Sequence, residues 1–204
     1  AGGVSRWDPA TWAFGHVPVA PAGGEGLSNG YVTSFAEDQA GRLWVGTMGG
    51  GINVFDRSTG EIRHYRRDAS RPGGLADDRV MSLLCDRSGD VWAGTMGGGL
   101  SRFQPSRGSF RTYREDPSRP GSLSSNGVIS LFEDDAGTVW VGTYRGGLDR
   151  YNRGTDSFTS YRNVPSDPGS LSGDIVTAIA EGPGGTVLWV GTEGAGLNRL
   201  DKSS

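Results

Sequence analysis

The sequence is poor in the residues that build redox, metal and membrane sites. It contains one cysteine and two histidines among 204 residues. Cys85 therefore cannot form a disulfide within the chain, and His and Cys are too few for a zinc cluster. No apolar run reaches the length of about 18 residues that a membrane helix needs, so we expect no membrane insertion.

The chain also lacks an excess of charge of one sign. Its net charge is −3, from 20 basic and 23 acidic residues. Proteins that bind nucleic acids or anionic membranes carry strongly basic surfaces, so this balance favours neither partner. No phosphate-binding loop and no Ser-His-Asp set is evident. The sequence thus predicts no catalytic residues, no metal site and no cofactor.

Glycine is abundant and recurs in register. The chain holds 36 glycines, well above the usual share of about 7 %. They punctuate aromatic and β-branched segments with a period of 48 residues, which Leu27, Leu75, Leu123 and Leu171 mark. A fixed period of this size indicates one supersecondary unit used repeatedly.

Each repeat contains four short apolar segments. The first segments, at 31–36, 80–84, 128–132 and 176–180, are apolar on both faces, which predicts strands buried on both sides. Asp and Gly at 38–41, 86–89 and 134–137 predict hairpin loops after them. Four antiparallel strands per repeat without helical periodicity predict an all-β fold, a β-propeller of about four four-stranded antiparallel blades.

The third repeat resembles the two-component-regulator propeller repeat. The resemblance lies in Pro120-Gly121-Ser122-Leu123-Ser124-Ser125-Asn126-Gly127-Val128-Ile129-Ser130-Leu131-Phe132-Glu133-Asp134, then Gly137, Trp140-Val141-Gly142-Thr143 and Gly146-Gly147-Leu148, and it recurs in every repeat. That family forms the periplasmic sensor region of bacterial hybrid histidine kinases. The resemblance therefore implies a propeller, a sensory role and a periplasmic or extracellular location.

We expect residues 1–204 to form one propeller domain. Residues 1–26 form a partial blade with a third and a fourth strand, because Trp7 and Phe14 align with Phe55 and Ile62. Full blades follow at 27–74, 75–122 and 123–170, and residues 171–204 form a blade that lacks its fourth strand. The additional third strand at the N-terminus is not needed to complete any of these blades.

This number of strands leaves three ways to complete the ring. Propellers close when a strand from one end of the chain completes the blade at the other end. The N-terminal fourth strand could complete the last blade of its own chain, or two chains could exchange strands in an eight-bladed ring with twofold symmetry. Alternatively, the chain is a piece of a longer propeller. The dimeric ring is favoured, so the expected partner is a second copy.

The candidate binding residues lie at one mouth of the channel that the first strands line. They follow the second strands at Met48, Met96, Tyr144, Arg145 and Glu193, and they precede or begin the first strands at Tyr31, Asp78, Arg79, Asn126 and Asp174. Polar and aromatic groups around a concave mouth favour a ligand site. Such groups suit a carbohydrate or another small extracellular ligand, although the same residues could be solvated loop tips.

Other recurring residues are assigned to the scaffold. A tryptophan occupies the same place in each second strand, which predicts packing between blades for Trp44, Trp92, Trp140 and Trp189. The hairpin loops begin with Asp38, Asp86 and Asp134. One carboxylate per turn is too few for calcium, so these aspartates are predicted to stabilise turns.

The remaining reactive residues are expected to be structural or superficial. His16 and His64 fall in outer-strand segments, which predicts surface positions away from the channel. Cys85 lies in an apolar run and is predicted to be a small buried hydrophobic residue.

Three functions are compatible with these features. The first is a non-catalytic, ligand-binding sensory module. The second is a structural or engineered assembly module, which the close agreement of surface segments such as 70–73 and 118–121 favours. The third is an enzyme, because some lyases that act on cyclic peptide antibiotics share a similar propeller. A lyase needs a histidine beside the mouth carboxylates of Asp78, Asp174 and Glu193, and neither histidine is expected there.

Overall fold

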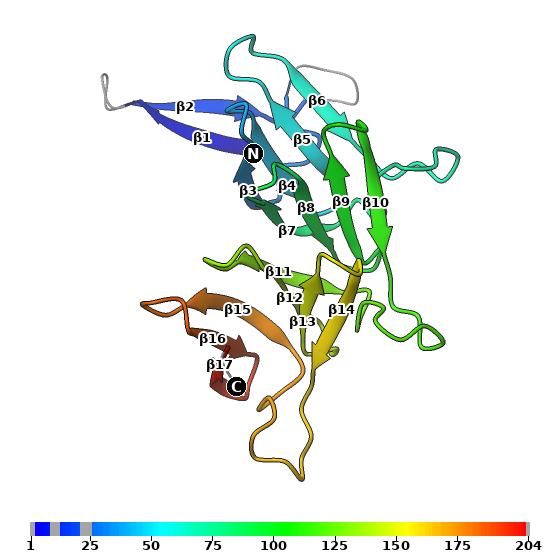
Figure 1. The fold of residues 1–204 in the computed structure, drawn as a ribbon. Helices are drawn as coiled ribbons and strands as arrows, with labels where there is room; N and C mark the ends of the chain where they lie inside the picture. The colour runs from blue at the N-terminus through cyan, green and yellow to red at the C-terminus, as the bar shows by residue number, and fades with distance from the viewer. Residues whose placement is uncertain (1–2, 9–12, 21–25, 203–204) are drawn as a thin grey trace.

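The chain folds into a series of antiparallel sheets, as a computed structural model shows for residues 3–8, 13–20 and 26–202 (Figure 1). Three sheets have four strands each. They are β3 (Val32–Glu37), β4 (Leu43–Thr47), β5 (Gly51–Phe55) and β6 (Ile62–Tyr65); β7 (Val80–Cys85), β8 (Val91–Thr95), β9 (Leu100–Gln104) and β10 (Ser109–Tyr113); and β11 (Val128–Glu133), β12 (Val139–Thr143), β13 (Leu148–Asn152) and β14 (Ser157–Tyr161).

Two smaller sheets contain the remaining described strands. β15 (Val176–Glu181), β16 (Val187–Thr192) and β17 (Gly196–Asp201) form a three-stranded sheet, and β1 (Gly3–Asp8) pairs with β2 (Ala13–Pro18). The predicted all-β fold of four-stranded antiparallel blades is thus confirmed, with three complete blades and a fourth blade of three strands. No helix that could cross a membrane occurs in the part of the chain that is described.

The blades follow one another in chain order, with their first strands in contact. β3 contacts β7, β7 contacts β11, and β11 contacts β15. The outer strands β6, β10 and β14 lie on the opposite side of the blades (Figure 1). Each first strand carries a bulge against its second strand, at 32–34, 80–82, 128–130 and 176–178. Because a bulge bends a strand and increases its twist, this repeated irregularity curves every blade in the same way.

The hydrophobic core lies between blades rather than within one of them. Trp44 of the first blade clusters with Leu75 and Val80 of the second. Trp92 likewise clusters with residues of the third blade, and Trp140 with residues of the fourth. Each blade therefore needs the next one to bury its tryptophan, as repeat architectures do.

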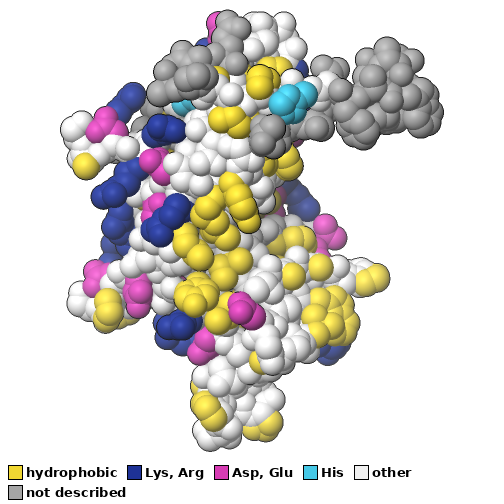
Figure 2. Space-filling model, turned by 180° about the vertical axis from the view of Figure 1, so that it is seen from behind, with side chains coloured by type: hydrophobic (Ala, Val, Ile, Leu, Met, Phe, Trp, Pro, Cys, Tyr) yellow, Lys and Arg dark blue, Asp and Glu magenta, His cyan; other side chains and the backbone are white. Residues whose placement is uncertain are grey.

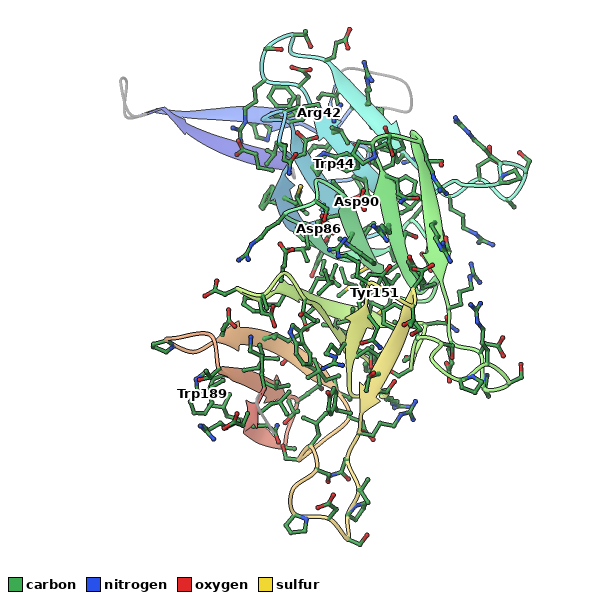
Figure 3. All side chains as sticks on the ribbon, in the orientation of Figure 1. Arg42, Trp44, Asp86, Asp90, Tyr151 and Trp189 are labelled. Carbon is green, nitrogen blue, oxygen red and sulfur yellow. The ribbon has the colours of Figure 1, made fainter. Side chains whose placement is uncertain are left out.

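The fourth blade departs from the predicted packing. Trp189 is 38 % exposed, whereas Trp44, Trp92 and Trp140 are at most 2 % exposed. The predicted packing of Trp189 between two blades is not seen among the described residues, where no further blade follows it. Figure 3 shows Trp189 in the last blade, away from the blade that contains Trp44.

The first strands are also less buried than predicted. Half of the residues of β7 and only Val128 in β11 are buried, Phe35 in β3 is 52 % exposed, and most residues of β15 are at least partly exposed. These strands face the channel, and β3 and β15 lie at the two ends of the row of blades. Because β11 has a neighbouring first strand on each side and is still only partly buried, the exposure comes from the face that borders the channel.

The described strands do not close a ring within one chain. Among the described residues β17 pairs only with β16, and β2 pairs only with β1. The segment after β2 nevertheless contacts the start of the first blade, in the same way that the segments after β6 and β10 contact the blades that follow them. The parallel bridge Val19–Leu27 recurs one and two repeats later as Arg67–Leu75 and Glu115–Leu123.

The hairpin turns between first and second strands form a continuous rim at one end of the channel. Gln39 Nε2 donates to the carbonyl of Arg87 over 3.1 Å. Arg87 N donates to Glu133 Oε2 over 3.0 Å, and Asp135 N donates to Glu181 Oε2 over 2.7 Å. We call this chain of contacts the turn rim. It links each blade to the next at the end opposite the predicted binding residues.

The charged side chains are distributed unevenly. Seen from behind, Lys and Arg side chains gather along one side of the molecule, and a band of hydrophobic side chains crosses the middle of this face (Figure 2). The outer strands and the segments beside them supply many basic residues, including Arg63, Arg66, Arg111 and Arg114. The basic side is therefore the outer side of the blades, away from the channel.

Candidate ligand-binding site

The channel mouth is built from two segments of each blade that hydrogen bonds hold together. In every blade the residue after the Gly-Thr pair donates its main-chain N–H to a residue at or just before the first strand. The four bonds are Met48 N to Tyr31 O, 2.9 Å; Met96 N to Arg79 O, 3.0 Å; Tyr144 N to Gly127 O, 2.8 Å; and Glu193 N to Ile175 O, 2.9 Å. The main chain thus fixes these positions and leaves their side chains available.

Several of these side chains are large, apolar and exposed. Tyr31 is 68 % exposed, Met96 38 % and Tyr144 37 %. Met48 is half-buried and forms a bridge with Arg79 of the next blade. Exposed apolar side chains therefore occur at the mouth of three neighbouring blades. Exposed apolar groups on a fixed main chain provide a contact surface that needs little reordering when a ligand binds.

Charged groups accompany the apolar ones. The guanidinium of Arg145 lies 5.0 Å from the centre of the Tyr144 ring, within the range of a cation–π interaction. Arg145 has a left-handed backbone, with φ of 71°. Arg79 forms an ion pair with Asp77 over 2.7 Å, and Glu193 is exposed at the mouth of the fourth blade.

Three predicted site residues serve to connect blades. Asp78 Oδ1 accepts Arg67 N over 2.6 Å, Asn126 Oδ1 accepts Glu115 N over 3.0 Å, and Asp174 Oδ1 accepts Asn163 N over 2.7 Å. Their carbonyl oxygens accept glycine N–H groups from the preceding blade. Because these groups are engaged in the fold, we define the mouth site by the others, namely Tyr31, Met48, Arg79, Met96, Tyr144, Arg145 and Glu193.

A buried Asp–Trp pair recurs in the first three blades and was not predicted. The indole Nε1 donates to an aspartate Oδ2 from Trp44 to Asp38 and from Trp92 to Asp86 over 2.8 Å, and from Trp140 to Asp134 over 2.9 Å. The turn role predicted for these aspartates is also present, since each Oδ1 accepts turn N–H groups. The constant spacing of six residues was the available signal. Gly182 replaces the aspartate in the fourth blade.

A basic residue from the following blade completes two of these pairs. Arg153 contacts Asp86 Oδ2 over 3.0 Å, and Lys202 contacts Asp134 Oδ2 over 3.0 Å. Burial raises the pKa of Asp134, but hydrogen bonds from Trp140, Thr138 N and Lys202 outweigh it and hold this pKa below its ordinary value. The pairs therefore stabilise the contact between consecutive blades.

A different buried acid lies in the third strand of the third blade. Asp149 is fully buried, and its Oδ2 accepts Ser124 N over 2.8 Å. Burial raises the pKa of this carboxyl above its ordinary value. Two of the three equivalent positions hold Asn53 and Asn198, whose Oδ1 atoms accept Ser28 N and Ser172 N in the same way, and the second blade has the buried Ser101 there. An amide oxygen therefore accepts this main-chain N–H without placing a charge in the core.

The histidines and the cysteine lie away from the mouth. His16 in β2 and His64 in β6 are both exposed and belong to outer strands, as predicted. Desolvation lowers the pKa of His64, whose Nδ1 lies 2.9 Å from Asn53 Oδ1. Cys85 is only half-buried, because β7 borders the channel, and burial raises the pKa of its thiol. No group of three or more metal-binding side chains occurs among the described residues.

Antiparallel blades arranged side by side around a channel define the class of β-propellers. The sequence places this chain within that class: the two component regulator propeller family model matches residues 26–49, 74–97 and 122–145. Three of the repeats thus each contain a segment that matches the repeat of this family. Each match runs from the last residues before a blade, through its first two strands, to the loop that holds Met48, Met96 or Tyr144 and Arg145.

Solved structures with a similar fold include two extracellular domains. The extracellular domain of a hybrid two component system from B. thetaiotaomicron is 26 % identical, with a TM-score of 0.77 over 87 % of this chain and 24 % of that one. The extracellular domain of a one component system from B. thetaiotaomicron is 24 % identical, with a TM-score of 0.73 over 100 % of this chain and 27 % of that one. The chain therefore spans about a quarter of the length of these extracellular domains.

An enzyme also shares the fold. Virginiamycin B lyase from Staphylococcus aureus is 17 % identical, with a TM-score of 0.55 over 84 % of this chain and 55 % of that one. At this identity the similarity concerns the fold alone. No curated protein sequence matches the chain.

Proposed function

We propose that this chain is a non-catalytic sensory module that binds a glycan at the mouth of an extracellular or periplasmic propeller. The proposal is supported by the family of its repeats and by its similarity to extracellular sensor domains. Those extracellular domains are about four times as long as this chain, so the proposed ligand rests on the mouth residues of this chain alone.

The observation that carries the proposal is the exposure of Tyr144 beside Arg145. An aromatic ring supplies an apolar face for the C–H groups of a sugar ring, and a guanidinium supplies several fixed hydrogen-bond donors for hydroxyl or carboxylate oxygens. Tyr31 and Met96 extend the apolar surface over the neighbouring blades. This combination favours an extended ligand, such as an oligosaccharide, over a single small molecule.

The repeat itself provides a conservative variant for the test. The first two blades have Met-Gly where the third has Tyr144-Arg145. The double substitution Tyr144→Met and Arg145→Gly therefore gives the third loop the sequence of its neighbours, and glycine tolerates the positive φ of residue 145. Folding should persist while the ring and the guanidinium are lost.

The test is a glycan array probed with the wild-type chain and this variant. We expect binding to a subset of glycans that falls at least tenfold in the variant. The double variant Arg150→Ala and Arg114→Ala, on the outer side, serves as a control that should bind normally. Equal binding by wild type and mouth variant, or no binding to any glycan, would contradict the proposed ligand site.

A second role, assembly with a second copy, is favoured by apolar side chains that are exposed on the last described blade. Leu197 in β17 is 67 % exposed, and Trp189 in the same blade is 38 % exposed. Exposed apolar groups that lie together mark interaction surfaces. Light scattering after gel filtration should give about twice the monomer mass of 21.5 kDa. A monomer at all concentrations would exclude this role.

A further inference from the structure

A pocket of about 450 Å³ lies on the outer side of the molecule, where the first blade meets the second. Its walls are the end of β6, the linker that follows this strand and the turn between β9 and β10. Both blades have all four strands, so the pocket is a feature of a complete blade interface. It shares no residue with the mouth site, and its volume falls within the range of about 300–1,000 Å³ that is typical of small-molecule sites.

The pocket is strongly basic. Arg66 and Arg71 come from the linker of the first blade, and Arg107 comes from the turn of the second. Asp68 is the only carboxylate among the described residues that line the pocket, and its Oδ1 already accepts the N–H and the hydroxyl of Ser70 over 2.9 and 2.6 Å. Positive charge is therefore in excess here, although the chain as a whole has a net charge of −3.

Two of the three guanidinium groups are available to a ligand. Arg71 and Arg107 form no side-chain hydrogen bond and no ion pair within the part of the chain that is described. Arg66 Nη2 donates to Ser28 O over a long distance of 3.4 Å. Desolvation and the charge of Arg66 lower the pKa of His64, which lines the same pocket. An anion that enters the pocket would thus meet donors without first breaking ion pairs.

The main chain that carries these side chains is fixed in advance. Phe110 N of the second blade donates to Gly73 O over 2.8 Å, which holds the linker against β10. Arg107 N donates to Gln104 O over 3.0 Å within its own turn. Binding would therefore order little more than the side chains of Arg71 and Arg107, which keeps its entropic cost low.

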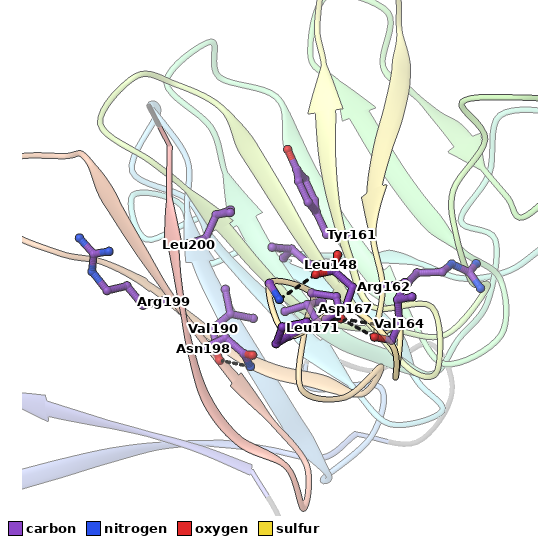
Figure 4. Close-up of a pocket in the computed structure, with 13 residues that line it drawn as sticks. Leu148, Tyr161, Arg162, Val164, Asp167, Leu171, Val190, Asn198, Arg199 and Leu200 are labelled. Atoms are coloured by element: carbon purple, nitrogen blue, oxygen red, sulfur yellow. Dashed lines mark hydrogen bonds between the residues drawn. The ribbon is translucent and has the colours of Figure 1, made fainter. Parts of the chain in front are cut away.

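The linker folds in the same way with an acid at the position of Arg71. Asp167 stands two repeats later and lines a different pocket together with Arg162 (Figure 4). Asp167 N donates to Val164 O over 2.8 Å, as Arg71 N donates to Asp68 O over 3.2 Å. The fold of the linker thus does not require the arginine.

The turn that holds Arg107 likewise accepts another residue. Thr59 and Thr155 stand at the same position of the first and third blades. The related pocket at the next blade interface is smaller, about 250 Å³, and two aspartates line it. One of them, Asp156, forms an ion pair with Arg111. The first interface therefore has the larger pocket and the greater excess of positive charge.

We propose that this pocket binds the phosphate or sulfate ester group of a soluble small molecule, with Arg71 and Arg107 as the main donors. A guanidinium presents its N–H groups in a planar fork that binds two oxygens of an oxyanion at once. Two guanidiniums from different walls suit a tetrahedral group, which has oxygens for both, better than a carboxylate, which has only two. The remaining space accommodates the rest of the molecule, such as a sugar ring.

The repeats supply a variant that should fold normally. Arg71→Asp with Arg107→Thr introduces the residues that stand at the equivalent positions of the third blade. Arg150→Asp with Arg57→Thr is the matched control, because it makes the same change in net charge at exposed residues outside the pocket.

An NMR titration of the arginine Nε–H signals tests the proposal, with glucose-6-phosphate and glucose-6-sulfate as probes and glucose as the neutral comparison. We expect at least one ester, and not glucose, to bind at millimolar concentration. The pocket variant should bind it about tenfold or more weakly, because charge-assisted hydrogen bonds are lost. The charge-matched control and the mouth variant should bind like the wild-type chain, which separates this site from the proposed glycan site.

Three results would overturn the proposal. The first is no binding of either ester, and the second is an equal loss in the charge-matched control, since binding would then follow net charge. The third is binding to phosphatidylglycerol vesicles but not to the soluble esters, which would assign these arginines to a lipid surface. If the pocket variant does not fold, Arg107→Thr alone should still weaken ester binding about threefold or more, and unchanged binding by that variant would equally overturn the site.

Discussion

The indole Nε1 of Trp92 donates a hydrogen bond to Asp86 Oδ2 over 2.8 Å, and both side chains are at most 2 % exposed. The same carboxylate accepts the main-chain N–H groups of Ser88 and Asp90 and contacts Arg153 of the next blade. One side chain therefore stabilises a turn, a buried indole and a contact between blades.

Replacing this carboxylate should destabilise the fold strongly. Asp86→Ala leaves the Trp92 N–H unpaired in the core and removes the turn bonds, which together should lower the free energy of unfolding by roughly 2–4 kcal/mol. Urea denaturation measures the change. Asp135→Ala, which removes an exposed carboxylate paired with Arg87, is the control and should cost at most about 1 kcal/mol. Similar losses in both variants would contradict the central role of the buried pair.

Glycine substitutions should separate backbone strain from steric conflict. Gly99 and Gly108 both have positive φ, 83° and 61°. A Cβ at Gly99 would lie 2.2 Å from Tyr113 O, whereas at Gly108 no described neighbouring atom lies within 4 Å. Gly108→Ala should cost about 1 kcal/mol, the strain of a left-handed residue. Gly99→Ala adds the conflict with the main chain and should cost about 3 kcal/mol or more. Equal costs, measured by urea denaturation, would refute the steric explanation.

Substituting the tryptophans should change the free energy of unfolding by different amounts in different blades. Trp44→Ala empties the interface with the second blade and should lower the free energy of unfolding by about 3–5 kcal/mol. Trp189→Ala should cost less than half as much in the single chain, because 38 % of this residue is already exposed. Thermal unfolding at a concentration where the chain is monomeric makes the comparison. A loss for Trp189→Ala as large as that for Trp44→Ala would show that its exposed face is covered.

The buried Asp149 should make stability fall as pH rises. Burial raises the pKa of this carboxyl, so the folded chain binds a proton that the unfolded chain has released above pH 4 or so. Its contribution is intact below the ordinary pKa and declines as pH increases through the raised one. Asp149→Asn removes this dependence and reproduces the residue found at 53 and 198. Urea denaturation from pH 4 to 8 should show the variant gaining relative to wild type as pH rises; a constant difference would contradict the prediction.

The sequence was sufficient to predict the blades because their pattern is local and repeated. The spacing that aligns Trp7 with Phe55 and Phe14 with Ile62 appears as the same strand register in β1–β2 and β5–β6. The interior contacts of Trp44, Trp92 and Trp140 follow from their place in a strand. The exposure of Trp189 does not, because it depends on whether another blade follows rather than on the residues around it.

The mouth was predictable in position but not in detail. Loop variation between repeats indicates where Tyr144 and Arg145 lie. It does not reveal that Asp78, Asn126 and Asp174 turn back to bind the preceding segment, because polar residues at a loop end suit either role. The Asp–Trp hydrogen bond could not be predicted either, because the role of the aspartate in the hairpin turn already accounts for its presence.

The turn rim gives the two ends of the channel different mechanical roles. Loops at the mouth vary from blade to blade, whereas Gln39, Arg87 and Asp135 connect neighbouring blades through their turns at the opposite end. A ligand that draws two blades together at the mouth must tilt them about this rim. Displacement in such a tilt increases with distance from the rim, so the mouth loops are the part of each blade with the greatest freedom to approach one another.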